Sequence, residues 1–287
     1  MLKQVHRKKF LVVGANSFLA REIISRIKVS HDITTVFHSN KDKLFHELPA
    51  VPVSEIELLP DQFDAVVILS AHIPIKGLPV NEHLLNEVNA KLPEKICNRF
   101  KSAKIIYASS VAVYGDGGRV LSESSASFNP TAYGASKKRG EVAVGAGAKN
   151  SIVRISSMYG PGMSKSTFLP QVIDAALENK KIKLYGDGSR RQNYIHVSDV
   201  AEFFIRASES ASNGVFLATG EQSYSNHAVA NEVKSILKGT EVVFEGEDQS
   251  VSFEYDAQET YRRLGYVPKI NIHDGISGLI QWQQKMF

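Results

Sequence analysis

Residues 10–20 read FLVVGANSFLA, four apolar residues that run into a glycine and then into a helical pattern. The run Phe10–Val13 predicts a short buried strand, and Leu19, Ile23, Ile24 and Ile27 share one side of the helix that follows. A strand, a glycine turn and a helix form the arrangement that binds dinucleotides, because the helix N-terminus offers N–H groups to a pyrophosphate. A plain strand–turn–helix corner would show the same pattern.

The glycine pattern of this loop is incomplete. A Gly-x-x-Gly-x-x-Gly reading aligns Gly14, Ser17 and Ala20, so only the first position is glycine. Ser17 leaves its backbone N–H available and adds a hydroxyl, and Ala20 is small enough for close packing of the helix on a sheet. We expect the cofactor contacts of this loop to come from five residues: Gly14, Asn16, Ser17, Phe18 and Leu19.

Four further apolar runs predict strands: Ile33–Phe37, Ala65–Leu69, Ala103–Ala108 and Ser151–Ile155. Helical patterns separate them, at residues 81–100 and from Tyr133 onward. Strands that alternate with helices imply a parallel sheet covered on both faces, which is a doubly wound α/β (Rossmann) fold.

The predicted helices and strands become shorter after Gly160-Pro161-Gly162. We expect residues 1–160, together with about 195–220, to form an NAD(P)-binding Rossmann domain. We expect residues 161–194 and 221–287 to form a smaller C-terminal α/β lobe that binds substrate. Val197–Ser208 and Val215–Ala218 are the segments expected to return to the main sheet.

The composition argues against several classes of function. The net charge of the 287 residues is only +4, and the basic residues are scattered, so nucleic acid is not an expected partner. The single cysteine, Cys97, excludes an intramolecular disulfide framework and suggests a reducing compartment. No His/Cys/Asp cluster has metal-ligand spacing, and no apolar stretch approaches the roughly 18 residues that span a membrane. We expect a cytoplasmic protein without a metal and without a membrane partner.

The end of the second predicted strand bears on the choice of cofactor. An acid there would bond the ribose 2′-hydroxyl of NAD, but Val36–Lys41 contains no carboxylate. Ser39, Asn40 and Lys41 could instead hold a 2′-phosphate. We count His38, Ser39 and Asn40 as cofactor-binding candidates and favour NADP, with NAD as the alternative. A polar, solvated loop with no role in cofactor binding would have the same composition.

Tyr133 and Lys137 lie four residues apart in the helix predicted after Asn129-Pro130, on one face. A phenol there can act as an acid–base group, and a nearby ammonium would lower its pKa from about 10 toward the working range. A surface helix with a lysine stem against a tyrosine ring has the same spacing. Ser109 and Ser110 follow the strand that ends at Ala108, where ligands bind in such sheets.

Together these motifs resemble the extended short-chain dehydrogenase/reductases, the NAD-dependent epimerase/dehydratase family typified by UDP-galactose epimerase and dTDP-glucose dehydratase. The resemblance covers nearly the whole chain and rests on the order of seven motifs: the Gly14 loop, Leu69-Ser70-Ala71, Asn89, Ser109–Gly115, Tyr133–Lys137, Arg154–Gly162, and Gly186–Gly188 leading to Tyr194–Val200.

The resemblance implies roles for individual residues. Tyr133 would be the acid/base, Lys137 would bond the nicotinamide ribose, and Ser110 would be the hydroxyl partner. Hydride would pass between nicotinamide C4 and a carbinol or keto carbon, with the protein supplying orientation and proton transfer. The resemblance also implies a homodimer formed through helices that flank the site. Further cofactor contacts would come from Leu69, Ser70, Ala71, Asn89, Ala108 and Ile155.

Departures from the family pattern bear on the substrate. Ser157 replaces the family's asparagine, and Gln192 replaces the arginine that grips the nucleotide diphosphate, a role that Arg191 or Arg190 could take over. Val111-Ala112 replaces the Asp-Glu pair of the dehydratases, so 4,6-dehydration is not expected. The substrate-binding candidates are His72, Ser109, Ser110, Ser157, Arg191 and Gln192.

These features predict an NAD(P)-dependent 4-ketoreductase or 4-epimerase of a sugar, expected to be nucleotide-linked. Two alternatives stay open. One is a reductase or dehydrogenase of a non-nucleotide carbonyl or alcohol, which Ser157 and Gln192 favour. The other is a non-catalytic dinucleotide-sensing protein, which the incomplete glycine loop favours and the set of Ser110, Tyr133 and Lys137 disfavours.

Overall fold

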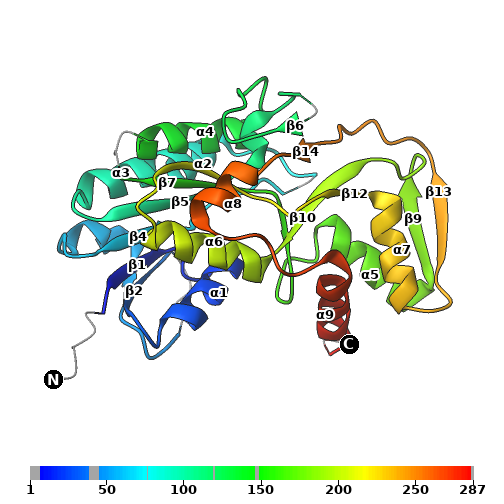
Figure 1. The fold of residues 1–287 in the computed structure, drawn as a ribbon, viewed down its shortest axis with the longest axis horizontal. Helices are drawn as coiled ribbons and strands as arrows, with labels where there is room; N and C mark the ends of the chain where they lie inside the picture. The colour runs from blue at the N-terminus through cyan, green and yellow to red at the C-terminus, as the bar shows by residue number, and fades with distance from the viewer. Residues whose placement is uncertain (1–6, 39–44, 76, 119, 146–148, 286–287) are drawn as a thin grey trace.

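A seven-stranded parallel sheet forms the centre of the protein, in the strand order β11-β7-β5-β4-β1-β2-β3 (Figure 1). The computed structural model describes residues 7–38, 45–75, 77–118, 120–145 and 149–285. Every pair of neighbours in this sheet is parallel. The predicted doubly wound α/β fold is therefore confirmed. The strands are β1 (Lys9–Val13), β2 (Asp32–Phe37), β3 (Ala50–Pro52), β4 (Ala65–Ile68), β5 (Lys104–Ser110), β7 (Ser151–Ile155) and β11 (Gly214–Ala218).

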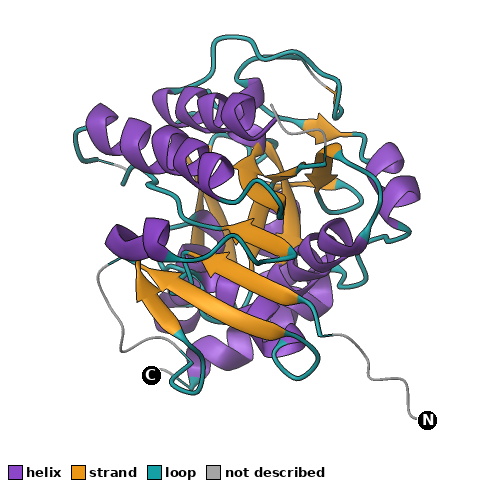
Figure 2. Ribbon diagram, turned by 90° about the vertical axis from the view of Figure 1, so that its left-hand side faces the viewer, coloured by secondary structure: helices purple, strands orange, loops and turns teal. Residues whose placement is uncertain are grey.

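Helices cover both faces of this sheet (Figure 2). Side chains alternate along a strand, so Phe10 and Val12 of β1 pack into one core and Leu11 and Val13 pack into the core on the opposite face. The first face carries α1 (Phe18–Ile27), α6 (Val197–Glu209) and α8 (Gln258–Leu264). The second face carries the 3₁₀ turn η2 (Val53–Leu58), α3 (Leu92–Arg99) and α4 (Ala132–Gly145). Helix α2 (Glu82–Asn86) and the π-helix η3 (Glu87–Lys91) pack against α4.

The helix predicted over residues 81–100 is not uniform, because the π-helix η3 interrupts it. The backbone N–H of Leu92 donates to the carbonyl of Glu87, a five-residue spacing. Pro93 follows and has no N–H, so it cannot donate to the carbonyl of Asn89 four residues earlier. The widened turn places Asn89 inside the protein, where it is 0% exposed.

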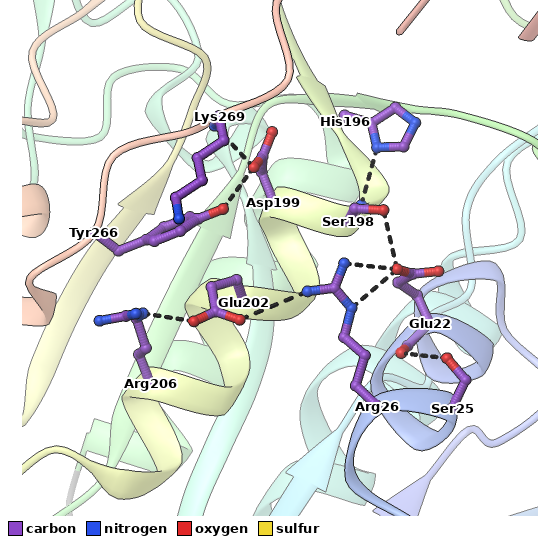
Figure 3. A network of polar contacts seen from close by, with 10 residues as sticks. All are labelled: Glu22, Ser25, Arg26, His196, Ser198, Asp199, Glu202, Arg206, Tyr266 and Lys269. Atoms are coloured by element: carbon purple, nitrogen blue, oxygen red, sulfur yellow. Dashed lines mark hydrogen bonds and ion pairs between the residues drawn. The ribbon is translucent and has the colours of Figure 1, made fainter. Parts of the chain in front are cut away.

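A polar network joins α1 to α6 and to the C-terminal part of the chain (Figure 3). The Glu22 carboxylate on α1 accepts hydrogen bonds from Arg26 and from the Ser198 hydroxyl of α6. Asp199, the next residue of α6, accepts from the Tyr266 hydroxyl at 2.6 Å and from the backbone N–H of Lys269 at 2.9 Å. These contacts fix the helix that follows the Gly14 loop against the rest of the molecule.

The chain beyond residue 156 adds a second, smaller group of elements, drawn at the right of Figure 1. It has its own apolar core, which includes Ile173, Val229 and Leu279. Its strands are β8 (Ser157–Tyr159), β10 (Arg191–His196) and β12 (Ser223–Ser225) in one sheet, and β9 (Lys181–Tyr185) with β13 (Glu241–Glu245) in another. Its helices are α5 (Phe168–Asn179), α7 (Asn226–Ile236) and α9 (Ile272–Gln284).

Three segments cross between the groups. Residues 257–266, which include α8, lie within the expected lobe but pack into the core on the first face of the large sheet. Residues 197–218 return to the large sheet as α6 and β11. The short strand β6 (Val120–Leu121), which follows the 3₁₀ turn η4 (Val111–Tyr114), pairs with β14 (Glu254–Tyr255). We propose that the division into a Rossmann domain and a C-terminal lobe, as expected from the sequence, follows these two cores except at residues 257–266, which were expected in the lobe but pack with the large sheet. In the part of the chain that the structure describes, no helix has both the length and the apolar character needed to cross a membrane.

Candidate active site

The order of the large sheet reverses between β1 and β4, and in such sheets ligands bind at the carboxyl ends of the strands at this point. Gly14 follows β1 and Ser70 follows β4. Gly14 has a φ of +87°, and a Cβ on it would lie 2.6 Å from the Ser70 nitrogen, so only glycine fits this crossing. A cleft of about 660 Å³ opens here.

The N-terminus of α1 faces this cleft. The Ser17 hydroxyl accepts a hydrogen bond from the Ala20 N–H at 3.2 Å and therefore caps the helix. The N–H groups of Phe18 and Leu19 open the helix and have no partner within it. The Leu19 side chain is buried in the core, so a contact of Leu19 with a cofactor would be made by its backbone.

Some of the predicted cofactor residues line this cleft. His72, predicted to bind substrate, lines this cleft as well, because it continues the segment that leaves β4. Ser39, Asn40 and Lys41 fall outside the described residues. The predicted residues that line the cleft are Gly14, Asn16, Ser17, His38, Leu69, Ser70 and Ala71.

Asn89 supports the cleft from behind rather than lining it. Its side-chain oxygen accepts from the His72 N–H at 2.8 Å, and its side-chain nitrogen donates to the His72 carbonyl at 2.9 Å and to the Ser136 hydroxyl at 2.9 Å. These contacts agree with a supporting role for Asn89 in the site, and its contact with the cofactor stays a prediction. Its amide ties the wall of the cleft to helix α4.

Tyr133 and Lys137 occupy successive turns of α4, as predicted from their spacing. Tyr133 is half-buried, whereas Lys137 is 1% exposed. Among the described residues the Lys137 ammonium has no hydrogen-bond partner, and it lies 4.1 Å from the centre of the Tyr107 ring. A buried donor without a partner is costly, which is typical of a site that a ligand completes.

The predicted effect of Lys137 on Tyr133 is wrong for the protein alone. Burial raises the pKa of Tyr133 to about 12, and a hydrogen bond with the Ser110 hydroxyl acts in the opposite direction. Burial also lowers the pKa of Lys137 to about 7, with the Glu141 carboxylate opposing that change. Desolvation therefore outweighs charge attraction here, and the Tyr133 phenol keeps its proton at neutral pH.

Ser109 and Ser110 point to opposite sides, because β5 extends through both residues. Ser110 lines a second cleft, of about 420 Å³. The Ser109 hydroxyl is buried and donates to Glu141 at 2.6 Å. The expectation that Ser109 contacts substrate is corrected by this orientation.

Glu141 and Arg154 form a buried ion pair beneath the serines that the sequence interpretation missed. The Arg154 guanidinium donates to both Glu141 oxygens at 2.8 Å and lies over the Tyr114 ring. Burial pushes the pKa of the Glu141 carboxyl up, but the hydrogen bonds and charge of Arg154 outweigh it and leave the pKa lowered. The signal was present in the sequence, since an arginine inside the apolar strand Ser151–Ile155 needs a buried partner.

The second cleft lies between the carboxyl ends of β5 and β7 and the strand β10. Ser157 and Gln192, both predicted for substrate, line it. Ile155, predicted for the cofactor, lines this cleft as well, because it pairs with Ser110 in the sheet. Ala108 is half-buried and packs against the core of the first face.

The two adjacent arginines of this cleft have different surroundings. Arg191 forms an ion pair with Glu254 and donates to the Ser223 carbonyl, so its guanidinium is occupied. Arg190 also lines the cleft, and its Nε is buried with no hydrogen-bond partner among the described residues. The structure therefore shifts the candidate phosphate-binding role from Arg191 to Arg190.

Comparison with known proteins identifies the family. The sequence profile of the NAD dependent epimerase/dehydratase family matches residues 10–217. The chain belongs to this family. Its membership confirms the predicted family and the predicted class, an NAD(P)-dependent enzyme.

The names of curated relatives of this epimerase/dehydratase chain describe enzymes that act on nucleotide sugars. A UDP-N-acetyl-alpha-D-glucosaminuronate decarboxylase of Bacillus cytotoxicus is 26% identical over 96% of this chain and 98% of the relative. A putative UDP-glucose 4-epimerase of Methanocaldococcus jannaschii is 27% identical over 66% of each chain.

Solved structures of similar fold cover nearly the whole chain. A UDP-N-acetylglucosamine 4-epimerase from Methanobrevibacter ruminantium M1, in complex with UDP-N-acetylmuramic acid, superposes with a TM-score of 0.89, at 20% identity over 98% of this chain and 99% of that one. A UDP-glucuronic acid 4-epimerase from Bacillus cereus, in complex with NAD, has a TM-score of 0.84, at 19% identity over 97% and 99%. At this level of identity the likeness shows the fold.

The residues of this family member fit a dinucleotide. The missing side chain at Gly14, where the chain passes close to Ser70, leaves room for a pyrophosphate against the first N–H groups of α1. Within the described part of the chain the buried Lys137 ammonium has no hydrogen-bond partner, and ribose hydroxyls would supply one. Within the described ranges, no group of three or more His, Cys, Asp or Glu side chains could hold a metal ion.

Proposed function

We propose that this protein is an NAD(P)-dependent oxidoreductase or epimerase that acts at a carbinol or keto carbon, C4, of a nucleotide-linked sugar. One observation carries the proposal. The Ser110 hydroxyl lines the second cleft and lies close enough to Tyr133 to act on the pKa of its phenol, and Lys137, one turn after Tyr133 on α4, is buried with no hydrogen-bond partner among the described residues. We infer that Tyr133 supplies the proton where a sugar in the second cleft meets a dinucleotide in the first.

The protein's part in the reaction is proton transfer and orientation. When bound, the nicotinamide supplies or accepts the hydride at its C4. The Tyr133 phenol is protonated at neutral pH, so it is ready to give its proton to a carbonyl oxygen held by the Ser110 hydroxyl. Lys137 would orient the ribose, and in its charged form would stabilise the phenolate that remains.

The nucleotide part of the substrate is assigned to the second cleft. Arg190 offers a guanidinium whose Nε has no partner among the described residues, and guanidinium geometry suits a diphosphate. Phe253 and Tyr255 line the same cleft and offer aromatic faces for a base. The names of the curated relatives, a UDP-sugar decarboxylase and a putative UDP-glucose epimerase, support the same substrate class.

The reaction class proposed is reduction or epimerisation rather than dehydration. Val111 and Ala112 follow Ser110 along the cleft wall, and neither can act as an acid or base. Among the described residues that line this cleft, Asp116 is the one carboxylate. An acid–base pair working at C5 and C6 of a sugar therefore has no candidates here.

The cofactor proposed is NADP in preference to NAD. The absence of a carboxylate in Val36–Lys41 supports NADP, because an acid at that point would repel a 2′-phosphate. The similar solved structures that contain NAD support the alternative. The cytoplasmic location and the homodimer expected from the sequence stay predictions.

The proposed function is tested by titrating the purified protein with NADPH and NADH, following fluorescence, and then adding UDP, dTDP, GDP and CDP. We expect NADPH to bind more tightly than NADH and one nucleotide to increase the signal and so name the base. Tight NAD(H) that stays with the purified protein would indicate an epimerase. Failure to bind any dinucleotide would overturn the assignment as an enzyme.

A second candidate is a reductase or dehydrogenase of a non-nucleotide carbonyl or alcohol. It is favoured by Ser157 and Gln192, which stand where the family's nucleotide-sugar enzymes carry an asparagine and an arginine. The Gln192 side-chain oxygen accepts from the Tyr194 hydroxyl at 2.6 Å, so it is already engaged within the protein. Dinucleotide binding with no response to any nucleotide would select this candidate.

A further inference from the structure

The aromatic ring of Tyr107 lies directly against the Lys137 ammonium. Lys137 Nζ is 4.1 Å from the centre of the ring, and both side chains are almost entirely buried. Since Lys137 Nζ has no hydrogen-bond partner among the described residues, the π face of Tyr107 is the favourable contact that the structure gives its charge.

The Tyr107 ring is held in place by its hydroxyl, which donates to the Asn89 carbonyl at 2.8 Å. That carbonyl is available because Pro93 has no N–H to offer it. The π-helix η3 directs it inward, toward β5 and α4. The Tyr107 hydroxyl thus takes the place of a missing helix hydrogen bond and fixes the ring at the same time.

Gly140 lets α4 approach this arrangement closely. A Cβ at Gly140 would lie closer than 3.0 Å to both the Asn89 carbonyl oxygen and the Tyr107 hydroxyl. Gly140 lies three residues after Lys137, on the same side of α4. Because the α4 backbone lies this close to the Tyr107 ring, the Lys137 side chain, one turn away, is held against the ring face.

Other titratable groups near Lys137 do not replace this contact. On α4, Tyr133 and Glu141 flank it at one turn on either side, and the Glu141 carboxylate favours the charged amine. Glu141 is itself neutralised by Arg154 of β7. On the π-helix, Glu87 pairs with Lys91 at the surface, with side chains 38% and 60% exposed.

We propose that Tyr107 is a positioning residue for Lys137: its ring face, anchored through Asn89, holds the ammonium in place and in its charged form for contact with the cofactor. This inference rests on the proposed function only for what Lys137 contacts. The relation between Tyr107 and Lys137 belongs to the protein alone and is measured without cofactor or substrate.

The test lowers the electron density on the ring face at position 107 while keeping the outline of the ring. Lysine labelled with ¹³C and ¹⁵N is introduced, and the Lys137 signal, assigned by its loss in Lys137→Met, is followed against pH. The comparison is between Tyr107→Phe and a variant with trifluorophenylalanine at position 107, whose ring has the same outline but an electron-poor face. We expect the midpoint of the Lys137 titration to fall by about 0.5–1.5 pH units in the fluorinated variant relative to Tyr107→Phe.

A matched control uses Tyr261, a buried tyrosine whose hydroxyl also donates to a backbone carbonyl, that of Thr219 at 3.1 Å. The same pair of substitutions at position 261 should leave the Lys137 midpoint unchanged. Equal midpoints in the phenylalanine and trifluorophenylalanine variants at position 107 would overturn the proposal. If the Lys137 midpoint falls as expected in the trifluorophenylalanine variant but the protein binds no dinucleotide, the result counts against the proposed function and not against the role of Tyr107.

Discussion

The Glu141 carboxylate and the Arg154 guanidinium pair through two parallel hydrogen bonds of 2.8 Å, with side chains only 3% and 4% exposed. Ser109 and Lys138 donate to the same carboxylate at 2.6 and 3.1 Å. Glu141→Gln leaves the Arg154 charge buried without a counter-charge. We expect it to lower the free energy of unfolding in urea by about 3–5 kcal/mol.

The matched control for this prediction is Glu259→Gln, which removes a carboxylate paired with Arg262 at the surface. We expect no measurable change there, because exposed pairs contribute little. The pKa of Glu141 is lowered in the folded protein, so its contribution is present above the ordinary value of 4.5 and is lost as the pH falls through the folded pKa. If the free energy of unfolding of Glu141→Gln is no lower than that of Glu259→Gln, the buried pair does not stabilise the fold around the site.

The burial of Lys137 gives a pH dependence of the same sign at higher pH, but here the charged form is the one that destabilises the fold. Its folded pKa of about 7 lies below the ordinary 10.5, so between these values the unfolded chain binds more protons and stability rises with pH. We expect Lys137→Met to be more stable than the wild type at about pH 7, with the gap closing by up to about 1.4 kcal/mol per pH unit toward about pH 9. Urea unfolding across that range measures it, and a gap that stays constant would contradict the burial of a charged lysine.

Gly140→Ala tests the close approach of α4 to Asn89 and Tyr107. The new methyl group would meet both closer than 3.0 Å, so we expect a loss of about 1–3 kcal/mol in thermal or urea unfolding. Gly278→Ala in α9 is the control, since a Cβ there meets nothing within 4 Å and helix propensity predicts a gain of up to about 1 kcal/mol. Equal effects of the two substitutions would show that α4 has room at position 140.

Arg190→Ala and Arg191→Ala separate the two neighbouring arginines. We expect Arg190→Ala to weaken the binding of the preferred nucleoside diphosphate by roughly 10- to 100-fold, the effect of losing a charged hydrogen bond. Arg191→Ala removes the pair with Glu254 and should affect stability more than nucleotide affinity. Calorimetric titration of both variants decides, and the reverse ranking would return the phosphate role to Arg191.

Much of the fold could be predicted because local pattern decides it. The apolar runs that became β1, β4 and β7 are buried in the large sheet, and the Gly14 turn is where the sequence placed it. The end of β5 was harder to predict. Serines are not typical of strands, yet pairing of Ser110 with Ile155 extends β5 by two residues and turns Ser109 toward Glu141.

The parts of the site that could not be predicted depend on contacts between distant residues. Arg190 and Arg191 are neighbours in sequence, and Glu254, more than sixty residues further on, occupies one of them. Asn89 enters the interior because a π-helix precedes Pro93, a shape that helical periodicity alone does not reveal. The pKa of Tyr133 depends on how much water burial removes, which charge spacing on a helix does not report.

In the proposed reaction the Tyr133 phenol moves the proton while hydride passes between cofactor and sugar. The most direct measurement compares wild type and Tyr133→Phe for turnover of the nucleotide sugar identified in the binding panel and for dinucleotide affinity. We expect turnover to fall by about 10²- to 10⁴-fold, while dinucleotide affinity stays nearly unchanged. A Tyr133→Phe protein that retained full activity would contradict the catalytic assignment.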